Sequence, residues 1–221
     1  MAQERRKTAG AGRIPADLPI DLDDLTPVDA TGFLAALPLE DARVEGADVA
    51  GAGVPSLTLT GVVLESVGLA RVTVRSAHLR DVRLVKCDLS NAVLRGFEAR
   101  RVEFIDCRLL GMKAIECRWQ DVLVDNCDAR YAQFNSGAVR LCEFRNSRLD
   151  EADFRAANLE GTIFPDSTLR RADLSGANLN TTNLRGADID GLVVRAGDLR
   201  GVLVTPPQAM DLARLLELVI G

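Results

Sequence analysis

The chain has few histidine, tryptophan, tyrosine and cysteine residues, which serve in many metal and catalytic sites. Its 221 residues include one histidine, one tryptophan, one tyrosine and five cysteines. A zinc site needs several ligands that converge on one point, and we expect His78 to face outward, away from the cysteines. Neither a glycine-rich phosphate loop nor a nucleophile with its base stands out. We therefore expect no cofactor, no metal site, no catalytic residues and no enzymatic activity.

Long apolar runs are also missing. No stretch approaches the roughly 18 consecutive apolar residues of a membrane-spanning helix, so we predict no membrane span. The first residues, MAQERRKTAGAGRIP, contain two adjacent arginines without a following apolar segment, which argues against a secretory signal. We expect residues 1–13 to form a disordered basic tail, and we expect the protein to be cytoplasmic.

The chain does have a strict period of five residues. From Leu39 to Val204, every residue whose number ends in 4 or 9 is apolar. The residues two places earlier, whose numbers end in 2 or 7, are small or apolar. All charged residues between Leu37 and Val204 fall on the other three positions. A repeat this regular is typical of a solenoid.

Neither an α-helix nor a flat strand can carry this period. Five residues of α-helix rotate by about 140° beyond a full turn, so the apolar positions would spread around the helix. Side chains of a strand alternate between faces, and five is odd. The central residues of successive repeats, whose numbers end in 4 or 9 and which we call centres, would therefore point to opposite sides. A short extended step followed by a corner of about 90° fits instead. Four such steps close a square coil of twenty residues, and stacked coils pair at about 4.8 Å. The repeat predicts an all-β solenoid of about eight coils over residues 39–204.

The repeat units resemble those of the pentapeptide-repeat family, which read roughly A(D/N)LXX. The match is clearest at ADFRAANLEG (Ala152–Gly161) and at RADLSGANLNTTNLRGADIDG (Arg171–Gly191). This resemblance implies a right-handed quadrilateral β-helix. In the N-terminal half, bulkier residues such as Leu57 and Val62 replace the usual alanine. We expect wider or less regular coils there.

The unusual residues of the chain fall mostly on inward positions. Trp119 occupies a centre, and small neighbours such as Ala99 are expected to leave it room. The five cysteines all lie two places before a centre, so we expect buried, reduced thiols that act as small apolar groups. They are Cys87, Cys107, Cys117, Cys127 and Cys142. Aspartates that recur at one outward position are expected to bond to the backbone at the corners. They include Asp88, Asp128, Asp173 and Asp188.

The two ends of the repeat differ from its middle. Residues 14–38 are acidic and interrupted by proline, and they fit either an N-terminal cap or an irregular first coil. After the repeat, Thr205 can cap a helix that begins at Pro206, so we predict a C-terminal capping helix over residues 205–221. Apolar residues lie on more than one side of this helix, so we expect a homodimer through it. The predicted dimer contacts are Met210, Leu212, Leu215, Leu216, Val219 and Ile220.

The family resemblance also implies a partner. Members similar to the mycobacterial fluoroquinolone-resistance type, which lack loop insertions, bind DNA gyrase with a negatively charged rod that imitates DNA. This chain shares an uninterrupted repeat, a predicted dimerising helix and a net charge of −5. The resemblance thus implies binding to DNA gyrase or another type II topoisomerase through an acidic surface toward the C-terminal end. We predict that Asp150, Glu151, Asp153, Asp166, Asp173, Asp188 and Asp190 form that surface.

The distribution of charge argues against simple DNA mimicry. Residues 71–120 carry 11 basic and 6 acidic groups, whereas the segments on either side are net acidic. A DNA mimic needs a continuous negative field, which a basic middle interrupts. Arginines also recur at multiples of twenty residues, at Arg80, Arg100, Arg140 and Arg200 and at Arg75, Arg95, Arg155 and Arg195. These rows either pair with neighbouring carboxylates or form a basic stripe for an acidic partner. Direct nucleic-acid binding is not expected, because Tyr131 is nearly the only outward aromatic residue.

We therefore interpret the chain as a non-enzymatic rod that presents a rigid surface to a protein partner. A type II topoisomerase is the most specific partner hypothesis. A general protein-interaction scaffold in bacterial regulation or assembly is the alternative.

Overall fold

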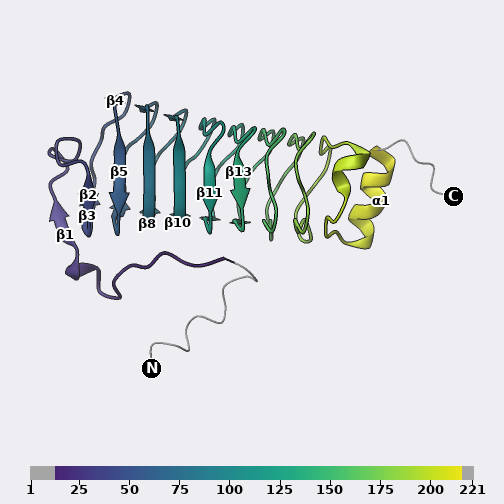
Figure 1. Cartoon of the computed structure of the whole chain (residues 1–221), viewed down its shortest axis with the longest axis horizontal. Helices are drawn as coiled ribbons and strands as arrows, with labels where there is room; N and C mark the ends of the chain where they lie inside the picture. The colour runs from purple at the N-terminus through teal and green to yellow at the C-terminus, as the bar shows by residue number, and fades with distance from the viewer. Residues whose placement is uncertain (1–12, 216–221) are drawn as a thin grey trace.

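The computed structural model describes residues 13–215, and its side chains are described to residue 213. These residues form a straight rod of stacked coils that runs from β1 at one end to helix α1 at the other (Figure 1). The predicted solenoid with a C-terminal helix is therefore confirmed. Residues 1–12 of the predicted tail and residues 216–221 of the predicted helix lie outside the described residues.

Short strands form the sides of the coils. In the first half they are β1 (Thr26–Val28), β2 (Leu39–Glu40), β3 (Ala42–Glu45), β4 (Gly53–Val54), β5 (Leu57–Thr60), β6 (Val63–Glu65), β7 (Thr73–Val74) and β8 (Ala77–Val85). Further along they are β9 (Val93–Leu94), β10 (Phe97–Ile105), β11 (Arg118–Gln120), β12 (Leu123–Asp125), β13 (Ala138–Arg140) and β14 (Glu143–Arg145). Strands β8 and β10 each continue around one corner and cover two sides of a coil.

Consecutive coils pair in parallel with a register of twenty residues. The register begins with Leu39 opposite Leu59 and continues to Asn183 opposite Leu203. One column of parallel backbone bridges joins eight successive coils. Its members are Asp48, Gly68, Asp88, Arg108, Asp128, Arg148, Thr168 and Asp188. A register without slips fixes which side chains stack along the rod.

The corners of the coils take the left-handed backbone conformation. Every described residue with a positive φ has a number ending in 1 or 6. Ten of these are glycines, and the other twenty carry side chains. Left-handed geometry costs an L-residue about 1–2 kcal/mol. The pairing between coils offsets this cost, because a residue such as Ala156, at φ 55°, still donates its N–H to the carbonyl of Ser175 in the next coil.

The predicted centres form the core. From Leu84 to Ile189 every centre is buried, and Val194 and Leu199 are partly buried. Trp119 is 1% exposed, and its ring lies 5.1–5.5 Å from the rings of Phe97, Phe104 and Phe134. The prediction that Trp119 belongs to the core is confirmed. Its neighbour across the coils is Ala99, which leaves room for the indole.

The five cysteines are free and buried, as predicted. Burial raises the pKa of the Cys117 thiol to about 12, so this thiol stays protonated at neutral pH. Cys107 Sγ donates to the carbonyl of Leu84 at 3.4 Å, and the N–H of Cys107 donates to Cys127 Sγ at 3.3 Å. Ser147 and Ser167 repeat this arrangement in the following coils. The inward column at positions 87, 107, 127, 147 and 167 therefore consists of small side chains that can bond to the backbone.

Helix α1 (Pro206–Leu215) closes the C-terminal end of the rod. Thr205 caps it as predicted, because Thr205 Oγ1 accepts from the N–H of Gln208 at 3.4 Å. The Gln208 amide then donates to the carbonyls of Leu184 and Ala187 at 2.7 and 2.8 Å. These carbonyls lie near the end of the stack, and the amide satisfies them. A short 3-10 helix (Ala196–Leu199) precedes α1.

The N-terminal segment has two parts. Strand β1 pairs with β3 at a register of sixteen residues, and Leu25 and Phe33 are buried at this end. Before the 3-10 helix at Leu22–Asp24, the chain runs lengthwise along the rod to about its middle (Figure 1). Within residues 13–215, no helix has the length and apolar character that crossing a membrane requires.

Replacement of Trp119 by alanine is expected to destabilise the chain by about 3–5 kcal/mol, because the cavity would lie among three phenylalanines in a closely packed core. Chemical denaturation followed by circular dichroism measures the change. Tyr131→Ala is the matched control, because Tyr131 is 50% exposed at a corner, and we expect a change within about 0.5 kcal/mol. Similar losses in the two variants would contradict the assignment of Trp119 to the core.

Candidate interaction surfaces

The predicted acidic residues lie mainly on two adjoining faces of the rod. Asp188 belongs to the face that also carries Asp128 and Arg148, and Asp153 and Asp173 stack on the next face. Asp166 lies at a different corner, with φ 53°. Thr168 pairs with Asp188, so Asp166 lies at the opposite edge of the Asp188 face from Asp190.

Arginines neutralise most of these carboxylates. Five of the seven lie within 4.0 Å of an arginine nitrogen. The pairs are Asp150 with Arg148, Glu151 with Arg171, Asp153 and Asp173 with Arg155, and Asp188 with Arg170. The Arg170 guanidinium holds the pKa of Asp188 below its usual range. Among the described residues, Asp166 and Asp190 have no such ion pair. The surface therefore carries alternating charges, which weakens its negative field.

The recurring aspartates also bond to the backbone at the corners, as predicted. Asp88, Asp173 and Asp188 each accept from the N–H two residues later, at 2.8, 2.9 and 3.1 Å. Asp128 makes the same contact at 3.4 Å. These carboxylates form part of the turn structure, so their recurrence follows from the repeat.

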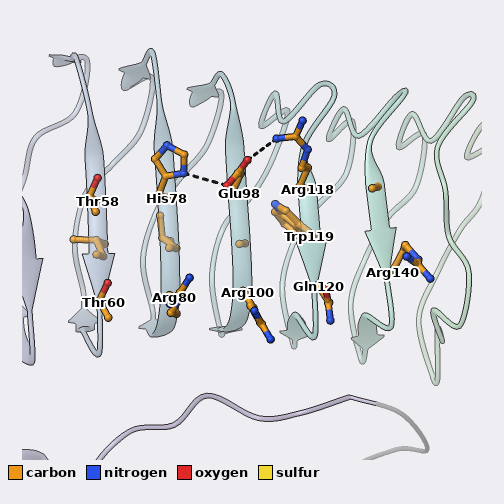
Figure 2. A pocket seen from close by; sticks show the side chains of 14 residues that line it. Thr58, Thr60, His78, Arg80, Glu98, Arg100, Arg118, Trp119, Gln120 and Arg140 are labelled. Carbon is orange, nitrogen blue, oxygen red and sulfur yellow. Dashed lines mark hydrogen bonds and ion pairs between the residues drawn. The ribbon is translucent and has the colours of Figure 1, made fainter.

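The middle of the rod presents a second surface, which is basic. Figure 2 shows one of its faces, where Thr58, His78, Glu98 and Arg118 come from four adjacent coils. Glu98 accepts from Arg118 Nη1 at 2.5 Å, and its other oxygen lies 3.4 Å from His78 Nδ1. The hydrogen bond from Arg118 holds the pKa of Glu98 below its usual range. Beside this row lies a shallow hollow of about 520 Å³.

A parallel row along the same face carries arginines. Arg80 and Arg100 are neighbours across β8 and β10, and Arg140 follows Gln120 in the register (Figure 2). Arg140 pairs with Glu160 at 2.9 Å. Around the preceding corner lie Arg95 and Lys113, which line a second hollow. The two hollows share Glu98 and Arg118, so they form one continuous surface.

We define the basic surface as six exposed residues on these two faces, namely Arg75, Arg80, Arg95, Arg100, Lys113 and Arg118. In the described part of the chain, none of these side chains except Arg118 makes a hydrogen bond or an ion pair. The two hypotheses for the arginine rows therefore each hold in part. Arg140 and Arg155 pair with carboxylates, whereas the arginines in the middle of the rod stay available to a partner.

Sequence reasoning missed a third feature, on the face next to the basic surface. Val63 and Leu123 occupy outward positions, yet they are 1% and 4% exposed. Asp81, Glu103, Asp121 and Glu143 on the same side are 1–7% exposed. We call these four carboxylates the acidic strip. Residues 13–17, the N-terminal strap, bond to it through Arg13 and three backbone N–H groups. Apolar residues at outward positions were the signal in the sequence that something covers this face.

The predicted dimer residues are only partly described. Leu212 is 5% exposed and packs into the core of its own chain, so it anchors α1 to the rod. Met210 is 46% exposed. The side chain of Leu215 and the whole of Leu216, Val219 and Ile220 lie outside the described residues. The homodimer therefore stays a prediction.

Comparisons with known proteins agree with the repeat. Residues 77–154 match the family described as "Pentapeptide repeat region", and residues 147–186 and 166–201 match "Pentapeptide repeats (8 copies)". Together these matches cover more than half of the chain. A comparison with curated proteins finds no match.

Several solved structures are similar. A trypsin-treated variant of QnrB1, a plasmid-mediated fluoroquinolone resistance protein, is 22% identical, with 91% of this chain and 96% of that chain covered and a TM-score of 0.43. Full-length QnrB1 is 18% identical over 80% and 99%, with a TM-score of 0.34. HetL, involved in heterocyst differentiation regulation in the cyanobacterium Nostoc, is 20% identical over 78% and 92%, with a TM-score of 0.33.

The ion pairs predict acid destabilisation. Arg145 donates to Asp125 at 2.8 Å and holds the pKa of this carboxyl below its usual range. A depressed folded-state pKa stabilises the fold above the unfolded value of about 3.9, and this stabilisation is lost as pH falls through the folded value. We expect Tm to fall between about pH 5 and pH 3, and less steeply in Asp125→Asn and in Arg145→Ala. If only one of the two variants changed the slope, the pair would not be the cause.

Proposed function

The chain belongs to the pentapeptide-repeat family, and we propose that it is a non-enzymatic scaffold whose basic surface binds an acidic face of another protein. One observation carries this proposal. Five exposed cations in the middle of the rod, namely Arg75, Arg80, Arg95, Arg100 and Lys113, have no ion-pair partner in the described residues. Elsewhere along the rod, arginines such as Arg155 and Arg170 pair with carboxylates.

The rigidity of the rod supports this proposal. Arg80 and Arg100 face each other in a register that the backbone fixes, so their spacing stays constant at about 4.8 Å per coil. A rigid row of cations loses little conformational freedom in its backbone when a partner binds. Unpaired cations also attract an acidic partner over several ångströms, and salt screens this attraction. The five free thiols fit a reducing compartment such as the cytoplasm.

A type II topoisomerase is the second candidate partner. The chain has a net charge of −5, and the acidic groups Asp166 and Asp190 lack an ion pair in the described residues. In this alternative the rod would occupy the DNA-binding groove of gyrase, and a homodimer through α1 would extend the rod. The arginines that neutralise Asp153 and Asp188 weigh against it, because they reduce the negative field.

Affinity capture from a lysate of the source organism separates these candidates. We expect the wild-type chain to retain a specific protein at low salt. The double variant Arg80→Glu/Arg100→Glu should lose it at least tenfold, because charge reversal turns attraction into repulsion. The control Arg71→Ala removes an exposed arginine at a corner outside the basic surface and should behave as wild type.

Each result decides between the candidates. If the charge-reversed chain retained its partner as well as the wild type, the basic surface would not be the site. Recovery of gyrase subunits, together with inhibition of gyrase supercoiling that Asp166→Lys/Asp190→Lys abolishes, would favour the topoisomerase. If the purified chain had no effect on supercoiling at micromolar concentration, DNA mimicry would be ruled out. Retention of duplex DNA alone would contradict a protein partner.

A further inference from the structure

The N-terminal strap lies across the acidic strip and bonds to it through its backbone. The N–H of Ile14 donates to Asp121 Oδ1 at 3.1 Å, and the N–H of Asp17 donates to Asp81 Oδ1 at 2.9 Å. Between them, the N–H of Ala16 donates to Glu103 Oε1 at 3.4 Å. Backbone N–H groups of an extended segment thus meet carboxylates from successive coils.

Arg13 completes this contact with its side chain. Its guanidinium lies 3.6 Å from Glu103 and 3.8 Å from Glu143, and the side chain is 8% exposed. Glu103, Leu123 and Glu143 are neighbours in three successive coils. A guanidinium near both glutamates therefore lies over Leu123, which explains the burial of this outward leucine. Arg13 Nε and Nη1 are buried without a hydrogen-bond partner, so the strip does not satisfy every donor of this guanidinium.

The strap contributes little apolar burial of its own. Ile14 is 54% exposed, and Ile20, just beyond the strap, is fully exposed. No strand pairing joins residues 13–17 to the rod within the described residues. Each polar bond of this kind adds only modestly to stability, because it replaces a bond to water, and somewhat more where a charged group takes part. The strap can therefore detach without disturbing the coils.

The strip that remains after detachment has a defined chemistry. Arg83 pairs with Glu103 at 2.9 Å, and Arg101 pairs with Asp81. In the described chain, no arginine or lysine nitrogen lies within 4.0 Å of Asp121, and the ion pairs of Glu143 are 3.8 and 3.9 Å long. Detachment of the strap therefore exposes carboxylates whose negative charge is only partly balanced by arginines of the rod. A ligand that supplies backbone N–H groups and one guanidinium matches them.

We propose that the acidic strip is a recognition site for an extended, arginine-bearing segment of a partner protein, and that the N-terminal strap occupies this site in the free chain. The strap shows the geometry that such a segment adopts. Arginine fits better than lysine, because a planar guanidinium can face two carboxylates at once. The strip lies on a different face from the basic surface, so this proposal stands whether or not that surface binds a partner.

Competition with a peptide tests the proposal on the full chain. The probe is a fluorescent peptide with the sequence of residues 11–19, AGRIPADLP, and the control peptide has alanine in place of its arginine. Arg13→Ala weakens the internal competitor, which otherwise acts at a high effective concentration. We expect this variant to bind the probe at least tenfold more tightly than the wild type. It should not bind the control peptide.

Further variants separate the strip from nonspecific binding. Adding Glu143→Gln to Arg13→Ala should abolish binding of the probe, whereas Arg71→Ala alone should match the wild type. Circular dichroism checks that each chain is folded, and Arg13→Lys replaces the alanine variant if that one is not. Equal affinities of the wild-type and Arg13 variants for the probe, or binding by neither, would overturn the proposal. A concentration-dependent doubling of mass that Arg13→Ala abolishes would also overturn it, since the occupant would then be the strap of a second copy.

Discussion

The whole molecule depends on parallel backbone pairing between coils at a register of twenty residues. This pairing places Ala99 beside Trp119 and Cys107 beside Cys127, so each inward residue packs against the residue twenty places away. It also holds twenty side-chain-bearing residues in left-handed corners that they would otherwise avoid. A single inserted residue that shifted the register would move every later inward side chain to an outward position. The sequence therefore tolerates wide variation only at the three outward positions of each repeat.

The period of five was sufficient to predict the core. It assigned Trp119, the cysteines and the centres to the interior, because an inward position depends only on residues five and twenty places away. Thr205 and its helix followed from local capping chemistry. The contacts of Arg13 could not be inferred in this way, because Glu103 and Glu143 lie 90 and 130 residues from it in the chain. The pairing of Arg170 with Asp188 was equally hidden, since it depends on the side-chain reach between coils.

The outer surface divides into parts with different chemistry. Toward the C-terminal end, carboxylates and arginines alternate and largely neutralise one another, as Arg155 does between Asp153 and Asp173. In the middle, Arg80 and Arg100 stay unpaired on one face, while the acidic strip on the neighbouring face is covered by the strap. A basic surface beside a strip of buried carboxylates suits a scaffold that contacts proteins more than a uniform imitation of DNA.

The coils form one rigid rod, and we propose that the strap is its detachable part. Native-state hydrogen exchange, resolved for single amides, tests both halves of this claim at once. Amides that pair the coils, such as those of Leu109 and Ala129, should exchange only through large-scale unfolding. The amides of Ile14, Ala16 and Asp17 should exchange much faster, through local opening. Strap amides that exchange as slowly as those of the coils would contradict this account.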